Sequence, residues 1–310
     1  MSLYEEINEE WSEYCLENLL ELGAPPPYYD ISSNSNITWK TIQKYSDKPW
    51  SYHWLSLNPN IKWKIIQKHS DKSWCYYYLS SNPNITWDIF QSNPDKFDKP
   101  WSYYWLSKNK NITWEIVQEN SDKPWNYGFL SKHPNITWEI VQENSDKPWD
   151  YALLSENPNI TWEIVCNNPD KNWDYSLLCL NQNITWDIFQ LHPDKLYDYK
   201  HMSQNSNITW EIVQSNSDKP WDYKLLSLNP NITFDIIRNN PDKSWHCYYL
   251  FCNKFTLEKE MFFRKKLCEW FKKSDLKREL IANLWHPKNY EKFKYYDPEM
   301  FLNEEEGEHE

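Results

Sequence analysis

One repeating unit constrains this chain more than any other feature. The stretch 135–151 reads Asn-Ile-Thr-Trp-Glu-Ile-Val-Gln-Glu-Asn-Ser-Asp-Lys-Pro-Trp-Asp-Tyr, and it recurs nine times with small changes. The aromatic residue at its fourth position returns every 24 residues, except for one step of 27 between Trp87 and Trp114. The series is Trp39, Trp63, Trp87, Trp114, Trp138, Trp162, Trp186, Trp210 and Phe234. A fixed period of this length is typical of a repeat array.

Each copy predicts two short helices. Thr137 suits the N-cap of the first helix because its hydroxyl can accept from a first-turn N–H, and Glu139 lies where the helix dipole favours an acid. The second helix is predicted to start near Asp146-Lys-Pro-Trp149, with Asp146 or a serine as its cap and the proline in its first turn. It should close at Ser155-Glu-Asn-Pro-Asn159, where asparagine tolerates a left-handed backbone.

An all-β repeat array is the alternative fold. Ile136, Trp138 and Ile140 alternate, and β-branched residues are frequent, as in a strand. Val141 breaks the alternation, and both segments carry the residues that start helices. We therefore predict an all-α fold, an α-solenoid of nine 24-residue helix-turn-helix repeats with helical caps. Helices of about two turns are not stable alone, so the copies must stack on one another.

The repeat sets the domain organisation that we expect, which is one elongated array with end pieces. Residues 1–33 should form an N-terminal helical cap over the first repeat, because terminal repeats expose an apolar side. Residues 34–252 hold the nine tandem repeats, and residues 253–303 should form a C-terminal helical cap. The acidic tail 304–310 is predicted to be disordered.

Composition excludes several classes of protein. The net charge of −12 disfavours nucleic acid and anionic membranes as partners. The seven cysteines are odd in number and do not follow the repeat, which indicates free thiols in a reducing compartment. The acidic N-terminus does not resemble a signal peptide, and no apolar run is long enough to span a membrane.

The Asn-Ile-Thr sequence matches the N-glycosylation motif in eight copies. We favour a structural interpretation, in which the asparagine makes a turn and the threonine caps a helix. Lys62 breaks the motif in one copy while Trp63 beside it remains.

The recurrent aromatic residues could form a ladder that stacks single-stranded RNA or a glycan. Their fixed place in each unit favours a role in the core instead. The variable positions, one and three residues after the second Trp, are better candidates for partner binding because packing does not dictate them. The residues that we single out there are His53, Tyr77, Tyr104, Asp150, Asp174, Asp198, Lys200, Asp222 and Lys224.

No catalytic or metal site is indicated. Gly is nearly absent, so there is no Gly-rich phosphate loop, and no His pairs with a repeated Ser or Cys. His246-Cys247 with Cys252 matches no common zinc pattern. We expect a protein that is not an enzyme and has no cofactor.

Charge drifts along the array. The first helices of copies one and two are basic, and those of copies four to six are acidic, so a bipolar rod could associate end to side. The charged residues are Lys40, Lys44, Lys62, Lys64, Lys68, Glu115, Glu119, Glu139, Glu143 and Glu163.

The unit Asn-Pro-Asn-Ile-Thr-Trp-Glu-Ile-Val-Gln-x-Asn-x-Asp-Lys-Pro-Trp-Asp-Tyr resembles a tandem repeat of proteins from mimivirus-like and other giant DNA viruses of amoebae. The resemblance covers about residues 34–250, and the stretch 284–298 is similar to the ends of such proteins. It implies a viral repeat protein of the host cytoplasm, at a viral factory or in the virion. Copy seven departs from the pattern, with Leu196-Tyr197 for Pro-Trp. The family supplies no catalytic residues to transfer.

These observations favour a non-enzymatic scaffold that binds a viral or host protein through an extended repeat surface. The first alternative is a self-associating structural component of the virion or replication compartment. The second is binding of single-stranded RNA or a glycan by exposed aromatic residues.

Overall fold

A computed structural model of the chain describes residues 2–22, 28–93, 101–192 and 198–273. All regular structure in these ranges is helical, so the predicted α-solenoid is confirmed and the all-β alternative is wrong. The chain divides into two compact units, Met1–Lys259 and Glu260–Glu310. Each is described by itself below.

The helices are short and alternate between two series. The N-terminal helix is α1 (Leu3–Glu21). The odd-numbered helices that follow are α3 (Trp39–Lys44), α5 (Trp63–Lys68), α7 (Trp87–Gln91), α9 (Trp114–Glu119), α11 (Trp138–Glu143), α13 (Trp162–Asn167), α15 (Trp186–Leu191), α17 (Trp210–Ser215), α19 (Phe234–Asn239) and α21 (Thr256–Lys273). The even-numbered helices are α2 (Tyr28–Ile31), α4 (Tyr52–Leu55), α6 (Tyr76–Ser81), α8 (Tyr103–Leu106), α10 (Tyr127–Ser131), α12 (Tyr151–Leu154), α14 (Tyr175–Leu178), α16 (Tyr199–Met202), α18 (Tyr223–Leu226) and α20 (Cys247–Cys252).

Threonine starts the first helix of a copy, as predicted. Thr137 is the N-cap of α11, and its hydroxyl accepts a hydrogen bond from the Ile140 N–H. The corresponding threonines cap α3, α7, α9, α13, α17 and α19 in the same way. Lys62 cannot accept this bond, and α5 begins without a side-chain cap.

The predicted start of the second helix is wrong. α12 begins at Tyr151, and its N-cap is Asp150, which accepts from the Leu153 N–H. Asp146 instead forms an ion pair with Lys147. The loop before the cap lets Trp149 reach back, so that its Nε1 donates to the Asn144 carbonyl at 2.8 Å.

The tryptophans join successive copies. Trp149 packs on Trp114 of the preceding copy, with ring centroids 5.4 Å apart, and Tyr127 meets it edge-on at 5.4 Å. Equivalent Trp–Trp pairs recur at 5.7–6.5 Å in the other described copies that keep both rings. Every repeat tryptophan in the described residues is buried or half-buried. The interpretation of these rings as core, rather than as an exposed ladder, is therefore confirmed.

A buried asparagine makes a second connection between copies. Asn157 is fully buried, and its amide nitrogen donates to the carbonyls of Ser131, His133 and Ile136 in the preceding copy. Its Oδ1 accepts from the Asn159 N–H. Every polar atom of this amide is therefore paired inside the wall. The predicted left-handed asparagine is wrong, because Phe255 is the one non-Gly residue with positive φ in the described part of the chain.

The asparagine of the Asn-Ile-Thr motif also points into the junction. Nδ2 of Asn159 donates to the carbonyls of Pro134 and Ile136 at 2.7 and 3.0 Å. A glycan would attach to this same nitrogen, so the contacts support the structural interpretation of the motif. A buried serine completes the junction, since Oγ of Ser155 donates to the Tyr151 carbonyl and accepts from the Asp174 N–H of the next copy.

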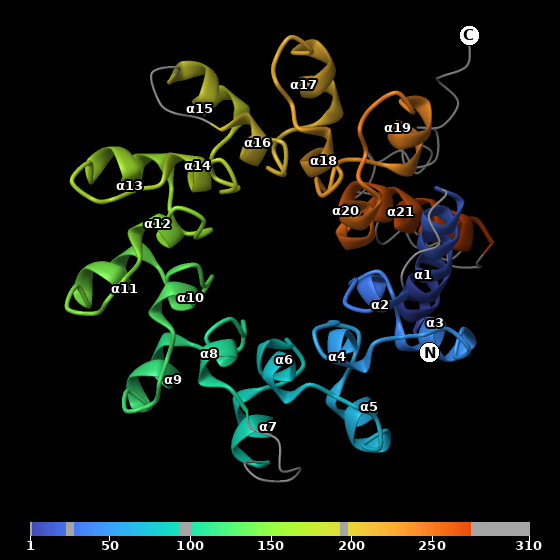
Figure 1. Cartoon of the computed structure of the whole chain (residues 1–310), viewed down its shortest axis with the longest axis horizontal. Helices are drawn as coiled ribbons and strands as arrows, with labels where there is room; N and C mark the ends of the chain where they lie inside the picture. Colours follow the sequence, from blue (N-terminus) through green and yellow to red (C-terminus); the bar gives the residue numbers. More distant parts are fainter. Residues whose placement is uncertain (1, 23–27, 94–100, 193–197, 274–310) are drawn as a thin grey trace, which may run out of the picture. The chain divides into compact units, whose positions relative to one another are not determined.

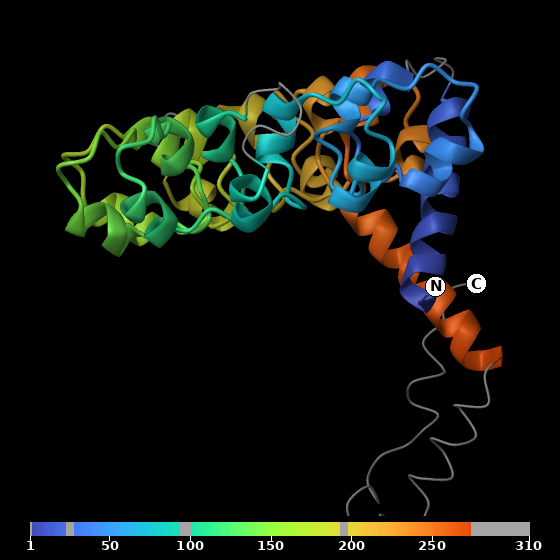
Figure 2. The ribbon, with the colours of Figure 1, turned by 90° about the horizontal axis from the view of Figure 1, so that it is seen from below.

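The expectation of an elongated array is wrong, because the array of the first unit closes on itself. The Asn34 amide donates to the carbonyls of Phe251 and Asn253, and Asn36 donates to Asn253 and Lys254. These bonds repeat the register of the internal junctions, and α2 packs against α20. Figure 1 shows the result as a ring. The even-numbered helices from α2 to α20 form its inner side, and the odd-numbered helices from α3 to α19 form its outer side. Edge-on, the repeats form a single layer (Figure 2).

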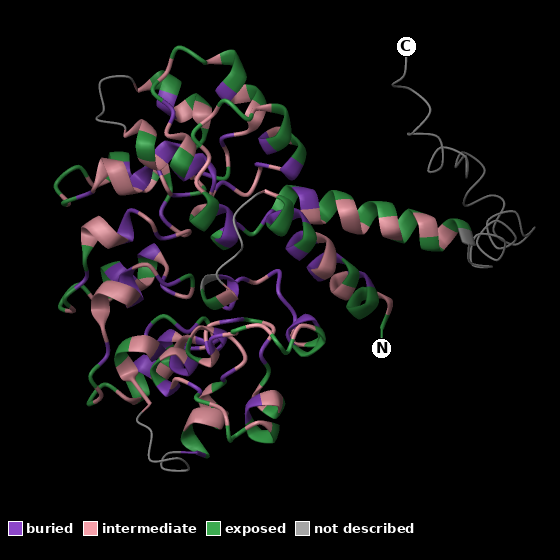
Figure 3. Ribbon diagram, turned by 45° about the vertical axis from the view of Figure 1, so that its right-hand side comes forward, coloured by how far each residue is buried: buried purple, intermediate pink, exposed green. Residues whose placement is uncertain are grey.

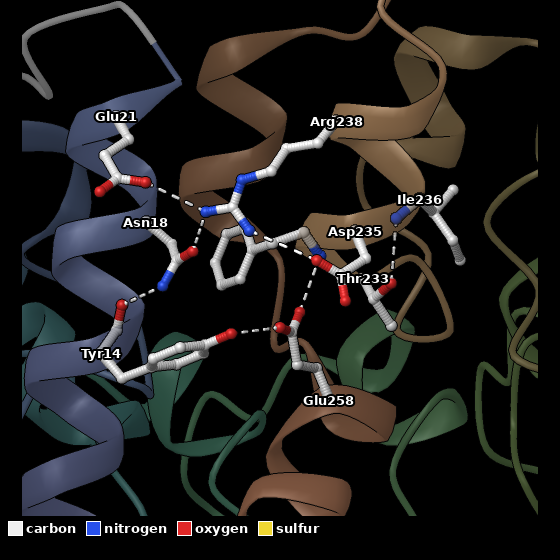
Figure 4. A network of polar contacts seen from close by, with 9 residues as sticks. Tyr14, Asn18, Glu21, Thr233, Asp235, Ile236, Arg238 and Glu258 are labelled. Atoms are coloured by element: carbon white, nitrogen blue, oxygen red, sulfur yellow. Dashed lines mark hydrogen bonds and ion pairs between the residues drawn. The ribbon is translucent and has the colours of Figure 1, made fainter. Parts of the chain in front are cut away.

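α1 crosses this closure, which we call the seam. On the first repeat, the Trp11 indole donates to Asn36 Oδ1 at 2.8 Å, and the Ser12 and Thr41 hydroxyls pair. On the last repeat, the Tyr14 hydroxyl donates to Glu258, and Arg238 contacts Asn18 and Glu21 (Figure 4). α1 thus covers both ends of the array and not the first repeat alone.

The second unit begins within α21. From Glu260 to Lys273 this helix carries three exposed apolar side chains, Met261, Leu267 and Trp270. The predictions for residues 274–303 and 304–310 lie outside the described residues. No helix in the described part of the chain is long and apolar enough to cross a membrane.

Candidate partner-binding surface

The variable positions lie at the N-caps and in the first turns of the even-numbered helices, which form the inner side of the ring (Figure 1). We call the residues one and three positions after the second Trp of each copy the inner row. The residues around these two positions are constrained by packing. The Tyr at the second position packs on the Trp of the next copy, and the Leu and Ser that follow are buried. Figure 3 shows buried, intermediate and exposed residues close together along the short helices of the array.

The first position of the inner row, one residue after the second Trp, has a structural role that the sequence analysis does not predict: in most copies it caps the even-numbered helix. Asp174 accepts from the Ser176 and Leu177 N–H groups, and Asp198 and Asp222 cap their helices in the same manner. Ser51, Ser102 and Asn126 do so in other copies. A position that reads Ser, Asn or Asp in seven of nine copies matches the N-cap preference, so the signal was present. Capping leaves carboxylate oxygens for a partner, since Asp150 stays exposed.

The second position of the inner row, three residues after the second Trp, is exposed to solvent in most copies. His53, Lys200 and Lys224 are exposed, and Tyr77 and Tyr104 are each 49% exposed. Gly128, Ala152 and Ser176 occupy this position in the middle copies. The site residues predicted from sequence are therefore spread over α4 to α18, one or two to a helix, and not gathered in a single pocket.

The structure adds a set of residues that the sequence interpretation missed. Four residues after the second Trp, copies one to four carry Trp54, Tyr78, Trp105 and Phe129. Their rings run continuously from helix to helix, with centroids 5.3, 5.1 and 6.4 Å apart. His53 meets Tyr78 at 4.7 Å, and Tyr104 meets Phe129 at 4.7 Å.

We call this set the aromatic arc. It comprises His53, Trp54, Tyr77, Tyr78, Tyr104, Trp105 and Phe129 on α4, α6, α8 and α10. Copies five to eight carry Leu153, Leu177, His201 and Leu225 at the fourth position, so the arc covers only one side of the ring. The sequence indicates this set by a change at the fourth position after the second Trp, from aromatic residues in copies one to four to mainly leucine in copies five to eight.

A lysine rests on the arc. Nζ of Lys108 lies 4.5 Å from the Trp105 ring centroid and 4.0 Å from that of Phe129. Burial against these rings, together with the charge of Lys132, lowers the pKa of Lys108. Lys132 is itself paired with Glu156 at 2.5 Å. The arc is thus able to hold an ammonium group against two ring faces.

An open hollow of about 440 Å³ lies beside the even-numbered helices of the later copies. It is lined by residues flanking the buried asparagines of five successive copies, among them Glu156, Gln182, Gln204 and Lys254. The concave side of the array therefore offers polar side chains as well as rings.

The described residues contain no group of three or more His, Cys, Asp or Glu that could hold a metal ion. The buried titratable groups lie at junctions. Desolvation lowers the pKa of His133, which replaces the buried asparagine in one copy and bonds to the Asn109 carbonyl. Desolvation raises the pKa of Glu258, and burial and the Glu258 carboxylate raise that of Tyr14 to about 12. These groups have structural partners within the junctions and the seam.

Comparison of the chain with family models, characterised proteins and solved structures finds no match in any of the three.

Proposed function

We propose that the protein is a non-enzymatic scaffold that binds a protein partner along the even-numbered helices of its ring. One observation carries the proposal: the same kinds of packing contact recur from copy to copy, while the residue three positions after the second Trp changes. Repeat proteins generally bind partners on an extended concave surface of this kind. The resemblance to giant-virus repeats adds the proposal that the partner is a viral or host protein in the host cytoplasm.

The test compares partners captured from infected-cell lysate by the full chain and by two variants. The inner-row variant combines His53→Ala, Tyr77→Ala and Tyr104→Ala, none of which removes a cap. The control variant combines Glu119→Gln and Glu143→Gln in the exposed last turns of outer helices. We expect the inner-row variant to lose specific partners and the control to retain them. Equal capture by all three proteins would contradict the proposal.

Self-association as a structural component is the second candidate, and the charge drift favours it. Lys40, Lys64 and Lys68 are exposed on α3 and α5, whereas Glu115, Glu119 and Glu139 are exposed on α9 and α11. Opposite charges on different outer helices could join rings side to side, rather than end to side as for a rod. Mass measurement at low and high salt tests this, and a monomer at both salt concentrations would reject it.

A further inference from the structure

We infer that the aromatic arc, together with the aspartates of the two copies that follow it, binds an arginine-containing segment of a partner protein. The inference rests on the proposed function and specifies the chemistry of the partner.

The first step is the exposure of the arc. Apolar rings normally cover each other in a stable wall, yet Tyr77 and Tyr104 keep nearly half of their surface open. Both stand next to ring-to-ring contacts that continue across four helices. Neither tyrosine is needed for the junctions, since Gly128, Ala152 and Ser176 occupy the same position in other copies.

The second step is the kind of group that these rings accept. Lys108 already lies over Trp105 and Phe129, which shows that cations are accommodated on the arc. A guanidinium stacks on aromatic faces more readily than an ammonium because it is planar and weakly hydrated. The arc is therefore suited to arginine.

The third step is the charge next to the arc. α12 packs directly against α10, and the N-caps of α12 and α14 are Asp150 and Asp174. In each cap one carboxylate oxygen, Oδ1, accepts the helix N–H, and Oδ2 takes no part in the cap and can face a partner. Arginine pairs with carboxylates as well as with rings. Unlike Asp198 and Asp222, these two caps have no lysine two residues later.

Single-stranded nucleic acid is the competing occupant because bases also stack on such rings. The aspartates in the adjoining copies would repel its phosphates, and the chain carries a net charge of −12. Lys108 and Lys110 are the cations in the turns after α8, and burial already weakens the ionised form of the first. Charge complementarity therefore favours a basic peptide.

The experiment uses the full chain and four labelled probes: octa-arginine, octa-lysine, octa-glutamate and a uridine 15-mer. Anisotropy titration should show binding of octa-arginine that is several-fold tighter than that of octa-lysine, with no binding of the other two. Tyr77→Ala with Tyr104→Ala should weaken octa-arginine binding about tenfold. Asp150→Asn with Asp174→Asn should weaken it about fivefold and flatten its salt dependence, while preserving both caps.

The control is Leu191→Ala, which removes a side chain that is 75% exposed on the outer helix α15. It should leave octa-arginine binding unchanged. The inference is overturned if the tyrosine pair binds octa-arginine as tightly as the wild-type chain. Uridine binding that depends on the same tyrosines would also overturn it, in favour of nucleic acid. If lysate partners still depend on the inner row, either result removes the arginine inference and leaves the proposed scaffold function standing.

Discussion

The internal junctions and the seam use the same asparagine contacts but differ in everything around them. At an internal junction, such as that around Asn157, the two copies are also joined covalently and by a Trp–Trp pair. At the seam, Asn34 makes corresponding bonds to residues 217 and 219 positions away. There the chain supplies α1, with Trp11 at 0% exposure, and the buried carboxylate of Glu258. The asparagine contacts of the repeats therefore continue across the seam, and α1 adds contacts there that the internal junctions do not have.

The difference also concerns ionisation. Internal junctions are built mainly from neutral amides, hydroxyls and indoles, with His133 and the Lys132–Glu156 ion pair as exceptions. The seam contains Glu258, Lys259 and Arg238, and Phe234 and Tyr14 donate to the Glu258 carboxylate. A buried charged group is costly unless it is paired, so the buried carboxylate and ammonium depend on their partners at the seam staying in place. We therefore expect the seam to be the part of the wall that opens first.

The largest expected effect is in an internal junction. Trp149→Ala should lower the free energy of unfolding by about 4 kcal/mol, because it removes a buried indole and leaves Trp114 and Tyr127 without their partner. Urea denaturation measures the change. Trp270→Ala, at an exposed indole of α21, is the control and should have almost no effect. Similar losses for both would mean that the tryptophans do not join the copies.

The next effect separates the two regions directly. Asn157→Leu should cost about 3 kcal/mol, since three buried carbonyls lose their donor. Asn34→Leu should cost less in global stability, because the ring can open while the internal junctions persist. Hydrogen exchange should then accelerate in α2 and α20 but not in α12. Uniform acceleration around the ring would show that seam and wall unfold together. Asn167→Leu, at an exposed position of α13, is the control.

Helix caps should give an effect of about 1 kcal/mol. Asp150→Ala removes the α12 cap and should cost about that much, whereas Asp150→Asn should be neutral. At the seam, α20 begins at the N-cap His246, whose side chain makes no capping hydrogen bond. His246→Asn should add about 0.5 kcal/mol, less than a full cap because its ring contact with Tyr249 is lost. Thermal melts measure both, and a loss on adding the cap would contradict the assignment.

The smallest effects depend on pH and have opposite directions. Burial lowers the pKa of His133, so its stabilising contribution is present above the ordinary value of 6.5 and is lost as the pH falls through the lowered one. Burial raises the pKa of Glu258, so its contribution is present below the ordinary value of 4.5 and is lost as the pH rises through the raised one.

Two variants isolate these contributions in melts between pH 4 and pH 8, a range that contains the ordinary pKa of both groups. The advantage of His133→Asn over the wild-type chain should grow as the pH falls below 6.5. The advantage of Glu258→Gln should grow as the pH rises above 4.5. Parallel profiles would show that these groups do not titrate as their burial requires.

Much of the fold could be predicted from the sequence because each junction is local. The period, the threonine caps and the buried tryptophans follow from contacts between residues about one copy apart. The sequence places the start of α12 too early because Asp150 varies between copies like a surface residue, although Ser, Asn and Asp share one capping function. The candidate site could be predicted only as a row, since the aromatic arc depends on which neighbouring rings touch.

Closure of the ring depends on a different kind of information. The rotation from one copy to the next is a small angle summed over the whole array, and no single residue specifies it. One clue was nevertheless present. Tyr28-Tyr-Asp-Ile-Ser-Ser-Asn34 matches the second half of a copy and precedes the first full repeat, whereas Asn253-Lys-Phe-Thr-Leu-Glu258 matches the first half of a copy and follows the last one. Two matching halves indicate that the ends are partners.

The ring closes only if Asn34 meets Asn253, so closure depends on the number of copies between them. An open solenoid tolerates duplication or loss of a unit, which merely changes its length. In this chain, one unit more or fewer would leave the terminal halves facing the wrong neighbours. Recombination between its near-identical repeats, which readily changes their number, therefore works against the closed form.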